Sequence, residues 1–370
     1  MIAACSLFFM FSLNVLQAQE TATALPHEHK ATEHASEEAH GSEKFDPGSA
    51  ILHHIADSHS FHFFDIKKSD GSVFSAGIPL PVILYSPQKG LDVFMSSKFH
   101  HGEAEHNGYR LDHDKVVPVD PNVKVYDFSM TKNVVQMILA VIVLIWILTS
   151  MVSKYKKGQG VTSAPKGMQN AIEPVITFVR DDIAKPNLGP KYMRYLPYLL
   201  TVFFFILINN IFGLLPGAAN VSGNIAFTAM LGIISFFVIL FSTNGHYWQH
   251  IFWFPGVPLP VKLIMMPVEL LGVFTKPFAL IVRLFANMTA GHIIVLSFIS
   301  LIFIFGNMSK VAGVGFSPVS VAFAVFIYLI EILVAFIQAY IFTNLTAIFI
   351  GGAIGDHHFE EGTEGKDAHH

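Results

Sequence analysis

Long apolar runs separated by polar segments fill the second half of the 370-residue chain. Three runs, at about 134–152, 196–215 and 225–241, have the length of a single membrane span, and two longer runs cover 263–305 and 319–350. About 20 apolar residues in a helix cross the ~30 Å hydrocarbon core of a bilayer. The sequence lacks the alternating segments of about ten residues that mark a membrane β-barrel. The pattern predicts an all-α integral membrane fold with about five transmembrane helices.

The two longer runs exceed what a helix perpendicular to the membrane needs. As continuous helices they would be roughly 65 Å and 48 Å long at 1.5 Å per residue, against a core of ~30 Å. We therefore expect two long, strongly tilted helices packed as a hairpin. Pro267 and Pro277 permit a break or kink early in the first helix, and residues 306–318 are expected to form the turn.

The chain before the first span divides into two parts. Residues 1–18 form a short apolar stretch typical of a signal peptide, with cleavage near Ala18 or as late as residue 24. Because this stretch has no Lys or Arg, an uncleaved anchor is the alternative. Residues 19–131 are polar and rich in His, which predicts an extracytoplasmic segment of low order. Residues 132–352 then form the transmembrane domain, and 353–370 form an acidic, His-containing tail.

The distribution of positive charge predicts the orientation in the membrane. The loop at 153–194 carries eight Lys and Arg residues, whereas the connection at 217–224 carries none. Short loops rich in Lys and Arg stay in the cytoplasm. We therefore expect a multi-pass protein of the cell inner (plasma) membrane with an extracytoplasmic mature N-terminus. Five crossings place the C-terminal tail in the cytoplasm.

Composition narrows the range of functions. The chain is 52% hydrophobic and only 14% charged, with a mean hydropathy of +0.51, which excludes an ordinary soluble enzyme. Its net charge of -4 gives no reason to expect nucleic acid, and the single Cys5 cannot form an internal disulfide. No phosphate-binding loop, Ser-His-Asp pattern or zinc-ligand spacing is present. We predict no catalytic site, cofactor or metal site; the His-rich segment is interpreted as a solvated tail, with weak zinc or nickel binding as the alternative.

Three ionisable residues lie deep in the apolar runs, namely Arg283, His292 and Glu331. Each charge there costs from about 3 to more than 10 kcal/mol, so each needs a physical explanation. Arg283 stays charged and must meet an anion or water. It either forms a structural ion pair with Glu331 or supplies a fixed charge on an ion path, and the second interpretation is preferred. Burial brings the proton affinities of Glu and His together, so His292 and Glu331 predict a proton relay, with a purely structural contact as the alternative.

Three amides extend this set of polar groups. Asn287 lies one turn after Arg283 and can bind the same partner, or it can serve as interhelical hydrogen-bonding glue. Gln338 lies two turns after Glu331, so the two side chains line one stripe about 10 Å long. Asn210 is either a solvated residue at the outer end of its span or a packing group, and the two interpretations stay open.

Two motifs carry a resemblance to a known family. They are the run RLFANMTAGH at 283–292, preceded by Lys276-Pro277, and the run QAYIFTNLT at 338–346; weaker similarity includes NIFGLLP at 210–216 and Asn224. Together they resemble subunit a of F-type ATP synthases, bacterial type, over roughly residues 125–352. The His-rich segment lies outside the family pattern.

This resemblance implies a mechanism and a set of partners. Arg283 would be the family's essential arginine, which faces a rotating ring of c subunits and separates two offset half-channels that deliver protons to the ring and release them. Asn287, His292, Glu331 and Gln338 match positions of the outer half-channel or its neighbourhood, with Asn210, Asn224 and Lys276 as possible further lining. The implied partners are the c-ring, the peripheral stalk b subunits, the soluble catalytic F1 head, the lipid bilayer and protons. ATP chemistry would take place in other subunits.

Two departures from the family pattern involve three positions. Many bacterial members carry Glu where this chain has His292 and His where it has Glu331, and some carry Asp where it has Gly213. A Glu–His relay survives the exchange if the two side chains face each other. His and Glu favour protons over sodium as the coupling ion. Two alternatives from other classes are a self-sufficient ion-coupled secondary transporter, for which no internal repeat is found, and a structural membrane scaffold held by an Arg283–Glu331 pair.

Overall fold

The computed structural model describes most of the chain from residue 57 to residue 354. The described residues are 57–67, 73–102, 104–112, 115–159, 167–215, 217–243, 251–252 and 258–354, with the single residues 48 and 248. The predicted signal peptide and nearly all of the C-terminal tail lie outside them. The chain divides into two compact units, one comprising 1–147, 205–230 and 281–338, the other 148–204, 231–280 and 339–370.

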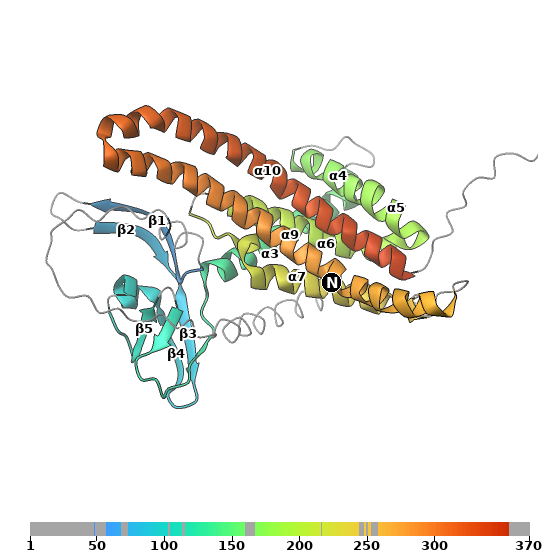
Figure 1. The fold of residues 1–370 in the computed structure, drawn as a ribbon, viewed down its shortest axis with the longest axis horizontal. Helices are drawn as coiled ribbons and strands as arrows, with labels where there is room; N and C mark the ends of the chain where they lie inside the picture. Colours follow the sequence, from blue (N-terminus) through green and yellow to red (C-terminus); the bar gives the residue numbers. More distant parts are fainter. Residues whose placement is uncertain are drawn as a thin grey trace, which may run out of the picture. The chain divides into compact units, whose positions relative to one another are not determined.

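Within the described residues, seven short strands precede the first long helix (Figure 1). All their pairings are antiparallel. They form three small sheets, one of three strands in the order β4-β3-β7 and two of paired strands, β1-β2 and β5-β6. Their bounds are β1 Ser60–Lys67, β2 Val73–Pro79, β3 Pro81–Ser86, β4 Gly90–Met95, β5 Tyr109–Asp112, β6 Lys115–Pro118 and β7 Tyr126–Asp127, with a 3-10 helix η1 at Ser96–Gly102 after β4.

The strands enclose a small hydrophobic core. Val82 and Leu84 of β3 pack with Phe99, Tyr109 and Val116, and all five side chains are buried. Composition predicts low order for residues 19–131, but the described part of this segment instead forms sheets around that core. The average polarity of the segment conceals short runs of alternating β-branched and aromatic residues, which are the pattern of half-buried strands.

Backbone contacts fix the strands to the start of the first long helix, α3 (Lys132–Lys156). The amide of Lys132 donates to the carbonyl of Ser58 at 3.0 Å. The amide of Asn133 donates to Oδ1 of Asp57 at 3.2 Å, which satisfies one of the free N–H groups of the helix end. Burial raises the pKa of the Asp57 carboxyl, and hydrogen bonds from Thr131 and Asn133 oppose that rise. The β-strand region and α3 are therefore joined by hydrogen bonds as well as by the chain.

The five predicted transmembrane helices are confirmed as helices long and apolar enough to span a membrane. The core helices of these spans are α3, α6 (Tyr192–Gly213), α7 (Ile225–Ser242), α9 (Leu259–Met308) and α10 (Lys310–Ile354). Their ends differ from the apolar runs by up to nine residues, because residues such as Lys132, Tyr192 and Lys310 continue the helices beyond the apolar stretches. From α3 onwards, the structure therefore has the all-α membrane fold that the hydropathy pattern predicts.

The basic loop at 153–194 contains helices that hydropathy does not predict. They are α4 (Met168–Phe178), the π-helical turn η2 (Val179–Ala184), the short α5 (Lys185–Leu188) and the 3-10 turn η3 (Gly189–Lys191). Within their unit they pack against the last part of α10. The rings of Phe178 and Tyr340 lie 5.6 Å apart, and Nδ2 of Asn187 donates to Oδ1 of Asn344 at 2.9 Å. Because these contacts join residues more than 150 positions apart, the local sequence pattern does not predict them.

The last two helices form the predicted hairpin, with a shorter turn than expected (Figure 1). Helix α9 has 50 residues and continues through Pro267 and Pro277, while α10 has 45 residues and contains Pro318. Only Ser309 separates the two helices, so the turn predicted at 306–318 is wrong in extent. Proline is tolerated within membrane helices because neighbouring groups satisfy the freed backbone carbonyls. At roughly 75 Å and 68 Å, both helices must tilt to fit a ~30 Å core.

Small and aromatic residues hold the tip of this hairpin together. An ideal Cβ at Gly313 would lie 2.7 Å from Cα of Gly306, so the backbones approach too closely for a side chain. The rings of Phe305 and Phe316 lie 4.6 Å apart, and those of Phe298 and Phe323 stack at 5.3 Å. These contacts hold the two helices together in the part of the hairpin that belongs to unit 1, residues 281–308 and 310–338.

Candidate functional site

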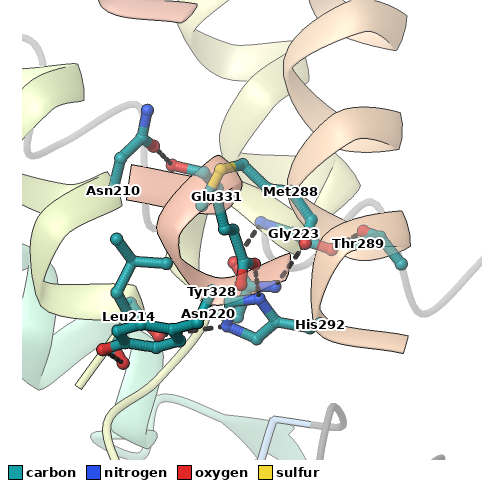
Figure 2. A network of polar contacts seen from close by, with 11 residues as sticks. Asn210, Leu214, Asn220, Gly223, Met288, Thr289, His292, Tyr328 and Glu331 are labelled. Atoms are coloured by element: carbon teal, nitrogen blue, oxygen red, sulfur yellow. Dashed lines mark hydrogen bonds and ion pairs between the residues drawn. The ribbon is translucent and has the colours of Figure 1, made fainter. Parts of the chain in front are cut away.

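His292 of α9 and Glu331 of α10 meet where the two long helices pack together (Figure 2). Nδ1 of His292 lies 2.5 Å from Oε1 of Glu331, and the Glu331 side chain is only 4% exposed. An ideal Cβ at Gly291 would lie 2.7 Å from the same carboxylate oxygen. Glycine at 291 therefore leaves the space in which Glu331 approaches α9. The two side chains face each other, which is the condition under which a Glu–His relay survives exchange of its members.

The end of helix α6 supplies acceptors to this pair. Nε2 of His292 lies 3.0 Å from the carbonyl oxygen of Gly213, and the hydroxyl of Tyr328 donates to the carbonyl of Leu214 at 2.6 Å. Carbonyls at a helix C-terminus have no partner within the helix, so side chains from elsewhere satisfy them. Because a carbonyl oxygen can only accept, the contact with Gly213 assigns a proton to Nε2 of His292.

The pair can therefore hold one shared proton between Nδ1 and Oε1. In the neutral arrangement, Glu331 is a carboxylic acid that donates to Nδ1 of His292. In the ionic arrangement, His292 is an imidazolium that donates to the Glu331 carboxylate. Both arrangements carry the same number of protons, and a small displacement of one proton converts one into the other. This is the chemistry that a proton relay requires.

A second layer of hydrogen bonds holds the backbone around the pair (Figure 2). Nδ2 of Asn210 donates to the carbonyl of Ala335 at 3.1 Å, and the Ser222 hydroxyl donates to Oδ1 of Asn210 at 2.5 Å. Nδ2 of Asn220 donates to the carbonyl of Met288 at 3.4 Å. These bonds join α6, the connection after it, α9 and α10 within unit 1. Asn210 is thus a buried, hydrogen-bonded group in this structure, and a role in lining a proton path stays a prediction.

Helix α10 presents a buried polar stripe that begins at Glu331. Gln338, two turns later, is also 4% exposed, and Ala335 between them is fully buried. The structure therefore places the two polar side chains on the same buried face, as their spacing predicts. Their role in proton transfer stays a prediction.

Arg283 and Asn287 lie on a different face of α9 from the residues packed inside. Arg283 sits at the midpoint of the 50-residue helix and is half-buried, while Asn287, Ala286 and Ala290 are exposed. Among the described residues, no carboxylate lies within 4.0 Å of the Arg283 guanidinium. The alternative Arg283–Glu331 ion pair is therefore wrong in this structure, because Glu331 is occupied by His292.

The two remaining predicted lining residues lie outside this cluster. Oδ1 of Asn224 accepts a hydrogen bond from the amide of Ala226 at 2.9 Å, so its side chain caps the start of α7. Lys276 belongs to the other unit, where its Nζ lies 5.4 Å from the centre of the Phe349 ring. It lines a pocket of about 200 Å³ between α7, α9 and α10. Within the described part of the chain, no group of three or more potential metal ligands is present.

Sequence reasoning did not identify Leu214 and Tyr328 as parts of the site, and it named Gly213 only as a departure from the family pattern. The carbonyls of Gly213 and Leu214 could not be found because backbone carbonyls carry no sequence signature. Tyr328 precedes Glu331 by three residues and shares its helix face, and this spacing was the signal that could have identified it.

Two family sequence models match parts of this chain. The sequence model of the family described as ATP synthase A chain matches residues 134–351, and one described as Domain of unknown function (DUF8433) matches residues 50–138. The chain is 48% identical over 252 residues to ATP synthase subunit a of Chloroherpeton thalassium, covering 66% of this chain and 72% of the relative.

Two further relatives match almost the whole chain, the strand-forming segment included. ATP synthase subunit a 2 of Chlorobium luteolum is 38% identical over 362 residues, covering 95% of this chain and 89% of the relative. ATP synthase subunit a of Anaeromyxobacter dehalogenans is 36% identical over 376 residues, covering 98% of this chain and 93% of the relative. Because the family match covers more than half of the chain and includes both helices of the site, this chain belongs to the ATP synthase A chain (subunit a) family.

Proposed function

We propose that this chain is the stator subunit through which protons reach and leave the rotating c-ring of an F-type ATP synthase. Its family membership makes it a multi-pass membrane component of such a complex and supports a proton-channel role in general. The finer proposal assigns two offset half-channels, one on each side of Arg283. Proton flow through them turns the ring and is coupled to ATP synthesis.

The observation that carries this proposal is a permanent charge without a counter-ion among the residues that the structure describes. Arg283 lies at the midpoint of a membrane-spanning helix, and no described carboxylate is within ion-pair distance of it. A charge so placed is costly unless an anion or water meets it. The exposed Ala286 and Ala290 beside it let another helix approach closely. A carboxylate on each passing c subunit would supply the missing anion, and Arg283 would keep that carboxylate ionised.

The His292–Glu331 pair is proposed as the relay that loads protons in the outer half-channel. The carbonyl of Gly213 holds the proton on Nε2 of His292, so Nδ1 is free to exchange a proton with Glu331. Gln338, on the same buried stripe, would extend the path along α10 towards Arg283. Asn287, one turn from Arg283, would bind the ring carboxylate or a water beside it. Asn210 would act by positioning the backbone of α10. Asn224 and Lys276 would have at most a minor part in proton transfer.

The remaining partners follow from the same proposal. The chain would have no catalytic site of its own, and ATP would be made in the soluble F1 head held by the peripheral stalk b subunits. The basic loop at 153–194 supports a cytoplasmic position for that loop, with the strand region outside the inner membrane. Protons, rather than sodium, are the proposed coupling ion because His and Glu exchange protons readily.

The experiment compares ATP-driven acidification of inverted membrane vesicles containing wild type, Arg283→Ala or Arg194→Ala. Arg194→Ala removes the same charge at the exposed start of α6 and serves as the matched control. We expect Arg283→Ala to assemble and hydrolyse ATP but to lose acidification, while Arg194→Ala retains it. A passive proton leak after removal of the catalytic head would further support Arg283 as the barrier between half-channels. Normal acidification by an assembled Arg283→Ala complex would refute the mechanism.

A further inference from the structure

The outer face of the three-stranded sheet β4-β3-β7 exposes apolar and aromatic side chains. Along β4, Leu91 and Val93 are 65% and 61% exposed, and Met95 is exposed as well. Tyr85 of β3 and Tyr126 of β7 are also exposed, with their rings 6.4 Å apart. These five residues are called the apolar sheet face below. None of them carries a charge.

The pairing register shows that these residues share one side of the sheet. Tyr85 is opposite Leu91 on one neighbour and opposite Tyr126 on the other. Val82 and Leu84, at the alternate positions of β3, point into the core instead. An antiparallel sheet with one face on a core usually presents polar side chains on the other. An outer face of apolar and aromatic side chains therefore indicates a surface that is covered in the working protein.

The way the sheet is attached to α3 identifies what can cover it. Four residues, 128–131, separate β7 from α3, and even a fully extended segment of that length reaches only about 18 Å. This segment is also bonded to β3, because the amides of Phe128 and Met130 donate to the carbonyls of Ile83 at 2.8 Å and Pro81 at 3.1 Å. The sheet is therefore held within a short distance of the point where α3 enters the membrane.

Exposed apolar side chains occur on both sides of the junction between the sheet and the helix. Phe128 and Met130 of the connecting segment are exposed, and α3 then exposes Leu139, Ile142 and Trp146, as a helix facing lipid does. The exposed Lys124 precedes Tyr126 and adds a positive charge beside the face. Tyrosines with apolar neighbours and a flanking lysine match the interfacial zone of a membrane, where aromatic rings sit at headgroup level and lysine meets anionic lipid.

We infer that the apolar sheet face lies on the lipid surface of the membrane that α3 enters, as an interfacial anchor of the strand region. Elements of this kind insert their apolar side chains about 5–10 Å into the boundary between headgroups and acyl chains. The short, hydrogen-bonded link to a helix long and apolar enough to span a membrane favours lipid over a protein partner. The inference does not rest on the proposed proton path, because it uses only the strand region and the first span.

The test places a fluorophore on the face of the full chain reconstituted in vesicles of phosphatidylethanolamine and phosphatidylglycerol. In a Cys5→Ser background, Val93→Cys and Leu91→Cys report the face, and Val119→Cys is the matched control, an exposed valine beyond β6 that does not belong to the face. Each is labelled with an environment-sensitive dye. Quenching is measured with lipids that carry a nitroxide near the carbonyl end or near the methyl end of the acyl chain.

We expect labels at 93 and 91 to be quenched several-fold more strongly than the label at 119, and more by the shallow nitroxide than by the deep one. Equal quenching at 93 and 119 would overturn the assignment to this face. An absence of quenching at 93 and 91 with water-like emission would overturn the inference altogether. Blue-shifted emission without nitroxide quenching would show that protein covers the face, and would overturn lipid as its occupant.

Discussion

At the scale of single residues, the site depends on which atoms can carry a proton. The carbonyl of Gly213 determines the side of His292 that is protonated, and the remaining ring nitrogen then faces Glu331. The pair works as a relay only if both members can gain and lose protons. A hydrogen bond alone would hold the helices together equally well, so substitutions that keep the bond but remove the titration distinguish the two roles.

Glu331→Gln is such a substitution. The Gln side chain has the same size and can still donate to Nδ1 of His292, but it cannot release a proton at neutral pH. We expect an assembled complex with ATP-driven proton pumping reduced by about an order of magnitude or more, since positioned proton-transfer groups commonly contribute that much. The measurement is acidification of inverted vesicles normalised to ATP hydrolysis. Unchanged pumping would mean that the pair is only a structural contact.

Gly291→Ala tests the position of the carboxylate rather than its chemistry. The added Cβ would lie 2.7 Å from Oε1 of Glu331, so the carboxylate must move away from His292. Gly272→Ala in the same helix is the control, because nothing lies within 4 Å of its added Cβ. We expect pumping to fall several-fold in the first variant only, with both complexes assembled. Equal activity of the two would show that Glu331 does not need this close approach.

At the scale of the elements, the hairpin of α9 and α10 fixes the site by close packing at its tip. Gly313→Ala would bring a methyl group to 2.7 Å from Cα of Gly306, and backbone cannot move aside as a side chain can. We expect a loss of about 1–3 kcal/mol in the free energy of unfolding, as for other overpacked positions. Unfolding by sodium dodecyl sulfate in mixed micelles measures it. Gly315→Ala, which meets nothing within 4 Å, should change stability little, and a similar loss there would contradict the packing argument.

Sequence patterns predicted these elements to different degrees. The five spans could be predicted because a run of about 20 apolar residues is typical of a membrane-spanning helix. The pairing of His292 with Glu331 could be anticipated because burying either ionisable side chain alone costs free energy. The strands could not be predicted from the average composition of residues 19–131, which is polar. Helices α4 and α5 depend on contacts with α10, which lies far along the chain. Gly213 and Leu214 act through carbonyl oxygens, which every residue has. The single-residue turn at Ser309 required knowing that Gly306 and Gly313 touch.

At the scale of the whole molecule, α9 divides its residues between two sides. Leu284, Met288 and His292 pack within the chain, with the first two almost fully buried. Arg283, Asn287 and Ala290 lie on another side, where Asn287 and Ala290 are exposed. A charge that faces lipid is costly, and small residues beside polar groups are typical of surfaces where another helix packs. This side of α9 is therefore the one that we propose contacts another subunit.

A photo-cross-linking residue at Ala290 tests which subunit completes that contact. If this side of α9 faces the c-ring, illumination of the assembled complex in its native membrane should join this chain to the small ring subunit. Ile142 on α3 is the matched control, because it is also an exposed apolar position on a helix long and apolar enough to span a membrane. Products are identified by mass spectrometry. We expect ring adducts from position 290 and few or none from 142, since only the first position has small neighbours that admit a helix. An assembled complex that yields no ring adduct from position 290 would leave Arg283 without its proposed partner.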